Sequence, residues 1–223
     1  MATFVLIHGG GSTSWDWHLV APLLEDSGHA VVAVDLPIED DDAGLSDYSA
    51  AVSTAADGAK HPIVVGHSLG GFTAPLACEE LQADGLVYLA GMIPLPGESF
   101  SQWWTNTGYD RESVEQNDDV AFYNDVPDHL AREARARTRD QRGAWMSLAW
   151  PAQSHPDVPT TAILCQDDRF FPAPFMRRHI IERLAIEPEE IPGGHYVTLS
   201  NPAGVASALD GFARDVSMRR RRR

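Results

Sequence analysis

Cysteine is scarce in this sequence, and long hydrophobic runs are missing from it. Only two cysteines occur, Cys78 and Cys165, and both stand in apolar surroundings, where a free thiol behaves as a small hydrophobic side chain. A disulfide framework is therefore not indicated. No stretch approaches the roughly 20 apolar residues of a membrane-spanning helix, and the start of the chain lacks the basic region and cleavage site of a signal peptide. We expect a soluble, cytoplasmic protein with no membrane partner.

Basic residues are also in short supply. The 17 Lys and Arg residues face 32 Asp and Glu residues, which gives a formal net charge of −15. Because such a chain repels a phosphate backbone, we expect no nucleic-acid partner. The arginine run at residues 219–223 is the contrary feature, and a basic interaction tail is the alternative interpretation. Like charges in a run repel each other, so residues 219–223 are predicted to be a disordered, solvated tail.

Short apolar runs alternate with segments of helical periodicity along the chain. A length of 223 residues with 43% hydrophobic and 22% charged residues suits one globular domain with a sizeable core. Helical spacing occupies residues 17–26, 48–59 and 72–81. Strands are expected at residues 3–7, 30–34, 62–65, 85–89, 161–165 and 187–191. This alternation predicts a doubly wound, mostly parallel six-stranded α/β sheet, whose ligands bind beyond the carboxyl ends of the strands.

Residues 92–159 interrupt this alternation with aromatic side chains between polar stretches. We interpret them as a small helical cap inserted into a core made of residues 1–91 and 160–218. Aromatic residues dominate both cores and binding pockets, so packing of the cap onto the body is the alternative role for each of them. The candidates for lining a substrate pocket are Gly9, Trp103, Trp104, Phe122, Tyr123 and Trp145.

The motif Gly66-His67-Ser68-Leu69-Gly70 follows a predicted strand and precedes a predicted helix. This context favours a nucleophile elbow, in which a sharp turn exposes the Ser68 hydroxyl and the glycines permit close backbone approach. An ordinary glycine-rich turn is the alternative. His67 is expected to point away from the nucleophile and to have a structural role.

Backbone N–H groups near Ser68 are candidates for an oxyanion hole. The N–H of Leu69 lies at a helix start, where developing negative charge is favoured. The second donor is expected from Gly10, because the glycine run after the first strand can approach the same oxygen. A flexible turn or a phosphate-binding loop is the alternative, although the run lacks the Lys and Ser/Thr of a P-loop.

The partners of Ser68 are sought after the last strands. His195 follows a glycine pair beyond the final strand and is the candidate base. The acid is expected directly after the strand at residues 161–165, where Asp167 and Asp168 both qualify. The chain order Ser, Asp, His is typical of α/β-hydrolases and differs from the orders of chymotrypsin-like and subtilisin-like enzymes.

These motifs resemble the α/β-hydrolase superfamily over nearly the whole chain, especially its small branch of plant methyl esterases and hydroxynitrile lyases. In that family the acid commonly stands four residues before a proline, as Asp168 does before Pro172, so the resemblance implies Asp168. It also implies an oxyanion hole made by the backbone of Gly10 and Leu69. The resemblance is carried by the segments FVLIHGGGSTSWDWHLVAPLLEDSGHAVVAVDLP, VVGHSLGG, GLVYLAG, CQDDRFFP and EEIPGGHYVTLSNP.

The expected function is a serine esterase that cleaves a small, largely apolar carboxylic ester or lactone through an acyl-enzyme on Ser68. No cofactor and no metal are required, and either a monomer or a homodimer is compatible with the sequence. A C–C bond hydrolase, a hydroxynitrile-lyase-like enzyme and a non-catalytic ligand-binding protein of the same fold are the alternatives. Cyanohydrin cleavage is disfavoured, because Tyr196 and Gly9 replace the lysine and threonine of the lyases that the chain resembles.

Overall fold

A single six-stranded sheet forms the centre of the protein. The computed structural model describes residues 1–221, and every adjacent pair of strands is parallel, in the order β2-β1-β3-β4-β5-β6. The predicted six-stranded sheet is thus confirmed and is wholly rather than mostly parallel. The strands are β1 (Thr3–Ile7), β2 (Ala30–Val34), β3 (Pro62–His67), β4 (Gly85–Leu89), β5 (Thr160–Cys165) and β6 (Glu189–Ile191).

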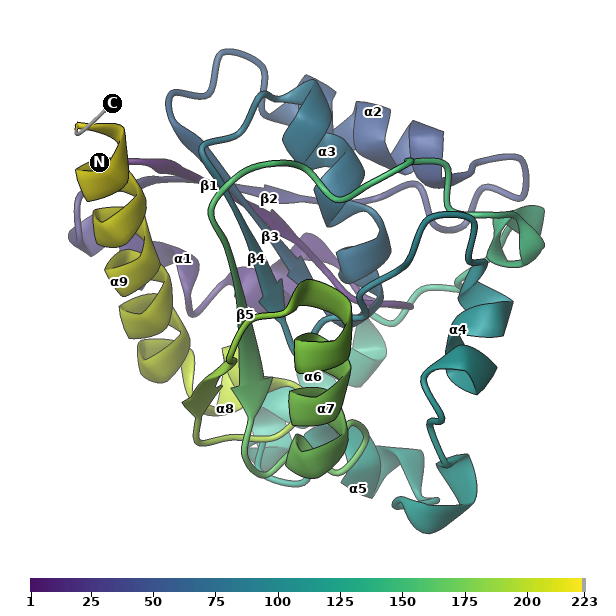
Figure 1. Ribbon diagram of the computed structural model, residues 1–223. Helices are drawn as coiled ribbons and strands as arrows, with labels where there is room; N and C mark the ends of the chain where they lie inside the picture. The colour runs from purple at the N-terminus through teal and green to yellow at the C-terminus, as the bar shows by residue number, and fades with distance from the viewer. Residues whose placement is uncertain (222–223) are drawn as a thin grey trace.

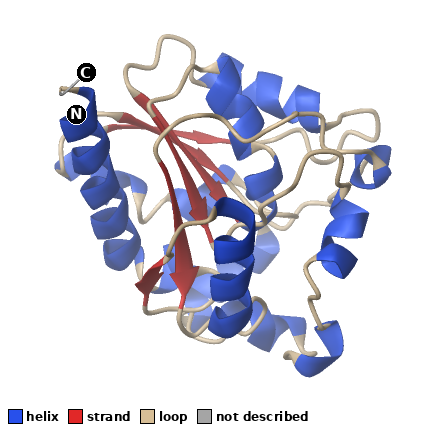
Figure 2. Ribbon diagram, viewed as in Figure 1, coloured by secondary structure: helices blue, strands red, loops and turns tan. Residues whose placement is uncertain are grey.

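Both faces of the sheet are covered by helices, as Figures 1 and 2 show. Successive side chains of a strand point to opposite faces, so the fully buried β1 feeds two cores. Phe4 and Leu6 join a core with α1 and α9, whereas Val5 and Ile7 join a core with α2, α3 and α7. These layers are built from α1 (Ala21–Asp26), α2 (Leu45–Ala55), α3 (Ala74–Glu80), α7 (Ala173–Leu184) and α9 (Pro202–Arg220), with a short α8 (Val197–Ser200) before α9.

The end of α9 corrects part of the tail prediction. Arg219 and Arg220, expected to be disordered, belong to this helix. Arginine is a good helix former, and Arg220 also pairs with Asp84 at 3.1 Å, so the helix continues into the arginine run. Residues 222–223 of the predicted tail lie outside the described residues.

We call residues 92–159, which lie between β4 and β5, the cap. Its helices gather at the carboxyl end of the strands (Figure 1). The helix α6 ends at Ala136, and shortly after it the N–H of Arg139 donates to the carbonyl oxygen of Gly11 in the loop after β1, at 2.9 Å. The cap contains α4 (Phe100–Asn106), η3 (Arg111–Ser113), α5 (Asp118–Tyr123), α6 (Asp128–Ala136) and η4 (Ala144–Ser147).

The strand order makes the carboxyl end of β1 and β3 the point at which the direction of the sheet's connections reverses. From β1 the chain first runs outward to β2 and then returns to β3 on the other side of β1. Loops that leave neighbouring strands in opposite directions open a gap between them, which is where ligands bind in sheets of this kind. The loops at this point are residues 8–12 after β1 and residues 68–72 after β3, the latter forming the 3₁₀ helix η2 (Ser68–Phe72).

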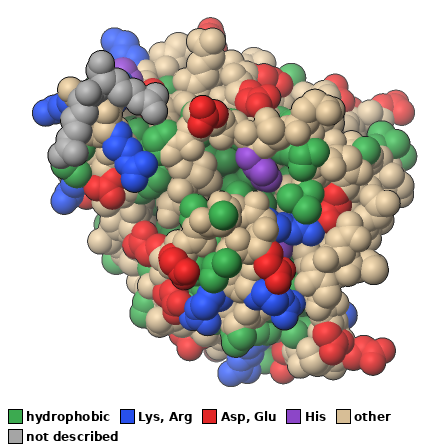
Figure 3. All heavy atoms as spheres, viewed as in Figure 1, with side chains coloured by type: hydrophobic (Ala, Val, Ile, Leu, Met, Phe, Trp, Pro, Cys, Tyr) green, Lys and Arg blue, Asp and Glu red, His purple; other side chains and the backbone are tan. Residues whose placement is uncertain are grey.

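The surface carries charge of both signs. In Figure 3 the acidic and basic side chains are interspersed over the visible face and form no continuous basic patch there. Within residues 1–221, no helix is long and apolar enough to cross a membrane.

Candidate active site

Ser68 stands on a strained turn between β3 and η2. Its φ of 50° lies in the left-handed region, which a non-glycine residue rarely adopts. The turn is also crowded. A Cβ at Gly66 would lie 2.7 Å from the Gly70 carbonyl oxygen, and one at Gly70 would lie 2.6 Å from the His8 carbonyl oxygen. The two glycines of the motif therefore allow the close backbone packing that holds the serine on this turn.

Gly71 is the tightest position of this turn, because a Cβ there would lie 2.1 Å from the carbonyl oxygen of Met92. We expect Gly71→Ala to lower the free energy of unfolding by about 3 kcal/mol or more, since backbone must move to admit the methyl group. Gly211 in α9 is the matched control, with no atom within 4 Å of an added Cβ. Gly211→Ala should raise stability by about 0.5–1 kcal/mol. Urea unfolding of both variants checks this prediction, and equal effects would contradict it.

Ser68, His195 and Asp168 form one hydrogen-bonded chain. The Ser68 Oγ lies 3.0 Å from Nε2 of His195, and Nδ1 of His195 lies 2.8 Å from Oδ2 of Asp168. All three residues are buried, with exposed fractions of 8%, 2% and 4% respectively. With the Nδ1 proton donated to the carboxylate, Nε2 is free to accept the proton of the serine hydroxyl.

The carboxylate of Asp168 is held by its own loop. Its Oδ1 accepts hydrogen bonds from the backbone N–H of Phe170 at 2.8 Å and of Phe171 at 2.7 Å. Asp167 is exposed and instead accepts a hydrogen bond from the N–H of Gly193 at 3.1 Å. The structure therefore brings Asp168 to the imidazole and uses Asp167 to tie the β5 loop to the histidine loop.

The histidine loop is fixed from two sides. Gly194 donates its N–H to Oδ2 of Asp125 in the cap at 2.7 Å, and a Cβ at Gly194 would lie 2.6 Å from both Asp125 and Asn124. On the other side, Nε2 of His67 donates to the carbonyl oxygen of His195 at 2.9 Å. Sequence reasoning missed Asp125, because nothing near it in the sequence marks a contact with residue 194.

Two histidines beside the triad, His8 and His67, stay neutral inside the protein. Burial lowers the pKa of His67 to about 3 and that of His8 to about 4. The Nδ1–H of His8 donates to the Gly9 carbonyl at 2.7 Å, and its Nε2 accepts from the N–H of Leu36 at 3.1 Å. These roles use the neutral imidazole, so His8 links the glycine loop to the end of β2.

These buried histidines predict a loss of stability in mild acid. Below about pH 6.5 the unfolded chain binds protons at His8 and His67 that the folded chain does not bind. The free energy of unfolding therefore decreases as the pH is lowered. Burial raises the pKa of Asp16 to about 6, which opposes this loss below about pH 6. Burial also lowers the pKa of His179 to about 3, so we expect a net loss of about 3–5 kcal/mol between about pH 7.5 and pH 5 in urea unfolding. Asp16→Asn should enlarge the loss, and a pH-independent stability would contradict the prediction.

The glycine loop after β1 lies directly against the elbow. A Cβ at Gly9 would lie 3.1 Å from the Cβ of Ser68, and one at Gly10 would lie 3.0 Å from Cδ2 of Leu69. Among residues 1–221, the N–H of Gly10 has no hydrogen-bond acceptor. A donor that is left unpaired beside the nucleophile can serve an oxygen of a bound substrate.

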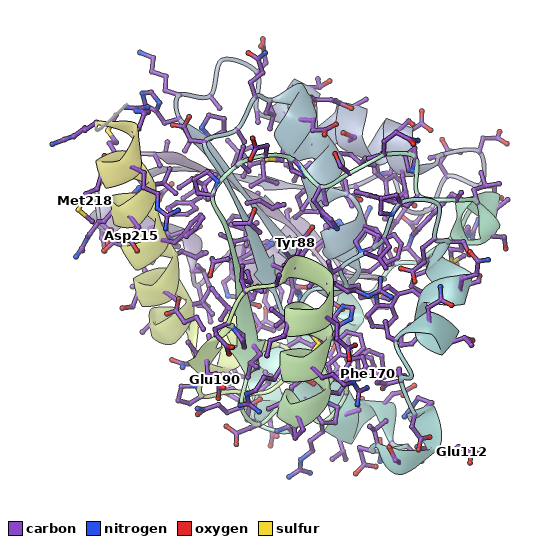
Figure 4. The ribbon with its side chains drawn as sticks, viewed as in Figure 1. Tyr88, Glu112, Phe170, Glu190, Asp215 and Met218 are labelled. Atoms are coloured by element: carbon purple, nitrogen blue, oxygen red, sulfur yellow. The ribbon has the colours of Figure 1, made fainter. Side chains whose placement is uncertain are left out.

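Phenylalanine rings surround the imidazole of His195. The ring centroids of Phe122, Phe170 and Phe171 lie 5.2, 5.1 and 5.3 Å from that of His195. Phe170 lies between α7 and the cap (Figure 4) and also borders a cavity of about 700 Å³. This cavity is lined by Trp104, Thr105, Gly108, Tyr109, Asp110, Arg111 and Phe170.

The predicted pocket residues fall into different places. Trp104 lines the cavity and Phe122 faces His195, whereas Tyr123 stacks on Tyr196 with ring centroids 4.7 Å apart. The prediction for Trp103 and Trp145 needs correction, because both belong to the hydrophobic core. Their indole N–H groups find internal acceptors, the Ile93 carbonyl at 3.1 Å and the Tyr48 hydroxyl at 3.2 Å.

Some residues around the site went unrecognised in the sequence. Phe170 stands two positions after Asp168, and that spacing was a usable signal because the acid is held by the N–H groups that follow it. Tyr109, whose hydroxyl donates to the Phe170 carbonyl at 2.7 Å, carried no local signal. Among residues 1–221, no cluster of His, Cys, Asp and Glu side chains is arranged to hold a metal ion.

A wholly parallel, doubly wound sheet with a serine elbow, a loop histidine and a strand-end aspartate at one edge defines the α/β-hydrolase class of fold. Comparison with known families agrees. The model of the family described as "Alpha/beta hydrolase family" matches residues 4–208, and the chain belongs to this family.

Relatives of known name include several plant proteins. Norfluorocurarine synthase 1 of a Strychnos species is 25% identical, with 94% of each chain covered. Polyneuridine aldehyde esterase of Rauvolfia serpentina is 34% identical over 110 residues, which are 44% of this chain and 42% of that protein. The more identical matches thus span about two fifths of those relatives' length, for example 39% of norfluorocurarine synthase 1 of Strychnos nux-vomica.

Solved structures share the fold over nearly the full length. A crystal structure of polyneuridine aldehyde esterase superposes with a TM-score of 0.79 at 23% identity, covering 97% of this chain and 99% of that one. A pyrethroid hydrolase from Sphingobium faniae JZ-2 superposes with a TM-score of 0.77 at 21% identity, covering 96% and 97%. These proteins therefore share the fold of this chain.

Proposed function

We propose that the protein is a serine hydrolase that cleaves a small, largely apolar carboxylic ester or lactone. The observation that carries this proposal is the hydrogen-bonded chain from the Ser68 Oγ through His195 to Asp168, at 3.0 and 2.8 Å. A serine hydroxyl is a weak nucleophile unless an adjacent base accepts its proton. Here the base is in contact with the hydroxyl, and its orientation is set by a buried carboxylate.

Each residue then has a defined step. His195 accepts the Ser68 proton as the oxygen attacks the ester carbonyl, and Asp168 stabilises the imidazolium that forms. The backbone N–H groups of Gly10 and Leu69 stabilise the oxyanion of the tetrahedral intermediate. The imidazolium returns its proton to the leaving alcohol, and a water activated by the same histidine hydrolyses the acyl-enzyme. These reaction steps use only groups of this chain and water.

The surroundings of His195 support an apolar substrate. Phe122 and Phe170 present their rings to the imidazole, and the cavity beyond Phe170 has Trp104 and Tyr109 in its wall. Aromatic walls favour apolar or aromatic groups over polyanions. Relatives named as esterases, including Methylesterase 1 of Arabidopsis thaliana, act on a bond of the same class.

The proposal is tested by reaction with an activated ester and with a fluorophosphonate. We expect p-nitrophenyl acetate to give a burst of p-nitrophenol followed by steady turnover, because an activated ester acylates the serine faster than water hydrolyses the acyl-enzyme. A fluorophosphonate should abolish turnover and add one phosphonyl group to the peptide that contains Ser68. A protein that is neither acylated nor labelled would refute the proposal, and labelling at another serine would refute the assignment of Ser68.

The two neighbouring tryptophans of α4 give a prediction about specificity. Trp104 borders the cavity, so Trp104→Ala should change the ranking of short-chain and aryl esters by kcat/KM, by about 10-fold for the larger substrates. Trp103 is fully buried, so Trp103→Ala should lower the free energy of unfolding by about 3–5 kcal/mol. A substrate panel and urea unfolding separate the two outcomes, and an unchanged ranking for Trp104→Ala would exclude the cavity as a substrate site.

A further inference from the structure

The loop that presents Gly10 has little means of fixing its own conformation. Residues 9–11 are glycines without side chains to pack, and Gly11 has a φ of +66°. The hydrogen bonds of Gly11 go to two residues of the cap, which lie 128 and 130 positions further along the chain. Its carbonyl oxygen accepts from the N–H of Arg139 at 2.9 Å, and its own N–H lies 3.4 Å from Oε1 of Gln141. The cap therefore holds the backbone next to the donor.

The side chain of Arg139 holds the same loop at further points. Its Nε and Nη2 donate to the Ser12 carbonyl oxygen at 3.1 and 3.0 Å. Its Nη1 donates to the Leu36 carbonyl oxygen at 3.1 Å, and its Nη2 also lies 3.1 Å from Nε2 of His8. One guanidinium thus contacts the loop after β1 on both sides of the glycine run, at His8 and Ser12. It also joins this loop to the loop after β2, at Leu36.

The charge and shape of the guanidinium matter for this arrangement. The Arg139 side chain is 21% exposed, and the Asp35 carboxylate lies 4.0 Å away. Hydrogen bonds from a charged donor are stronger than neutral ones, and a planar fork fixes several acceptors at once. Lysine carries the same charge as a single point and cannot span these acceptors.

We propose that Arg139 is a positioning residue that holds the Gly9–Ser12 loop so that the Gly10 N–H is directed at the developing oxyanion. The cap is then a structural part of the oxyanion hole as well as a wall of the substrate site. This inference rests on the proposed hydrolase function. Because a donor displaced by a fraction of an ångström loses much of its effect on the transition state, the cost of disturbing Arg139 should fall on kcat.

Substitution of Arg139 tests the proposal. We expect Arg139→Gln and Arg139→Lys to lower kcat for p-nitrophenyl acetate by about 10- to 100-fold, with KM changed by less than about threefold. Affinity for a trifluoromethyl ketone, whose adduct with Ser68 carries the oxyanion, should fall by the same factor as kcat/KM. Affinity for the isosteric methyl ketone, which binds without forming that oxyanion, should stay constant. Added guanidinium should restore part of the activity of Arg139→Ala.

Arg132 supplies the matched control in the same cap. Its side chain is exposed, and within residues 1–221 it donates only to the Asp128 carbonyl of its own helix, at 3.3 Å, so Arg132→Gln should leave kcat unchanged. Thermal unfolding shows whether each Arg139 variant is folded. If Arg139→Gln is not folded, the kcat of Arg139→Lys and the guanidinium rescue of Arg139→Ala test the role of Arg139 instead. Wild-type kcat in folded Arg139 variants, or equal losses of both ketone affinities, would overturn the inference. Turnover by Ser68→Ala would instead overturn the hydrolase function itself.

Discussion

Ser68→Ala is expected to lower kcat/KM for a chromogenic short-chain ester by on the order of 10⁴- to 10⁶-fold, with the fold unchanged. The Ser68 Oγ is the atom that His195 contacts at 3.0 Å, and alanine offers no atom that can form the acyl-enzyme. Residual rate above that of water is expected from the oxyanion donors and from substrate binding. Steady-state kinetics together with intact-protein mass spectrometry measure the loss of turnover and of the acyl adduct.

The control for this variant is its stability. Alanine keeps the Cβ of Ser68 and the left-handed backbone, whose φ is 50°, so urea unfolding should differ from that of the wild type by about 1 kcal/mol or less. Turnover by a folded Ser68→Ala protein within tenfold of the wild-type rate would eliminate Ser68 as the nucleophile.

Asp168→Asn is expected to lower kcat by about 10⁴-fold. The asparagine Oδ1 can still accept from the N–H groups of Phe170 and Phe171, which lie 2.8 and 2.7 Å from the present oxygen. Its NH₂ group then faces Nδ1 of His195. Because two donors cannot share that contact, the imidazole must carry its proton on Nε2, where it can no longer accept the serine proton.

Asp167→Asn is the matched control for this prediction. Asp167 is the adjacent residue with the same side chain, yet its contact is the Gly193 N–H at 3.1 Å, which an asparagine oxygen also satisfies. The kcat of the Asp167→Asn variant should therefore stay within about threefold of the wild-type value. The pH profiles of kcat are measured for both variants. Equal decreases in kcat would contradict the assignment of Asp168 as the orienting acid.

Much of the core was predictable from local sequence because its elements are specified locally. Apolar runs of strand length marked β1, β2, β4 and β5 within one residue. Burial on both faces explains the apolar runs of β1 and β4 and most of β5, whereas the edge strand β2 is partly exposed and was marked by its β-branched residues. The helices were predicted less well at their ends. The segment before α1, for example, contains a 3₁₀ helix at Ser14–Trp17, where Thr13 caps the turn and Pro22 delays the α-helix. Such boundaries depend on caps and turns rather than on hydrophobic periodicity.

The roles of the cap residues were less accessible from sequence. Trp103 and Trp104 are neighbours of the same type, yet one is fully buried and the other lines the cavity. The two side chains are chemically identical, and only the direction in which α4 packs gives them different environments. The contacts of Arg139 and Asp125 with the loops after β1 and β6 likewise join segments that are far apart in the chain.

The sequence by itself determined the alternation of strands and helices and the places where a serine, an aspartate and a histidine follow a strand. Glycines, apolar runs and turn residues act over a few neighbouring positions, so their effect can be inferred without coordinates. Only the tertiary structure decided which aspartate reaches His195, which aromatic rings line the cavity beside Phe170 and which arginine contacts the glycine loop. These outcomes depend on how distant segments pack against one another, and that packing is fixed by the whole fold rather than by any local pattern.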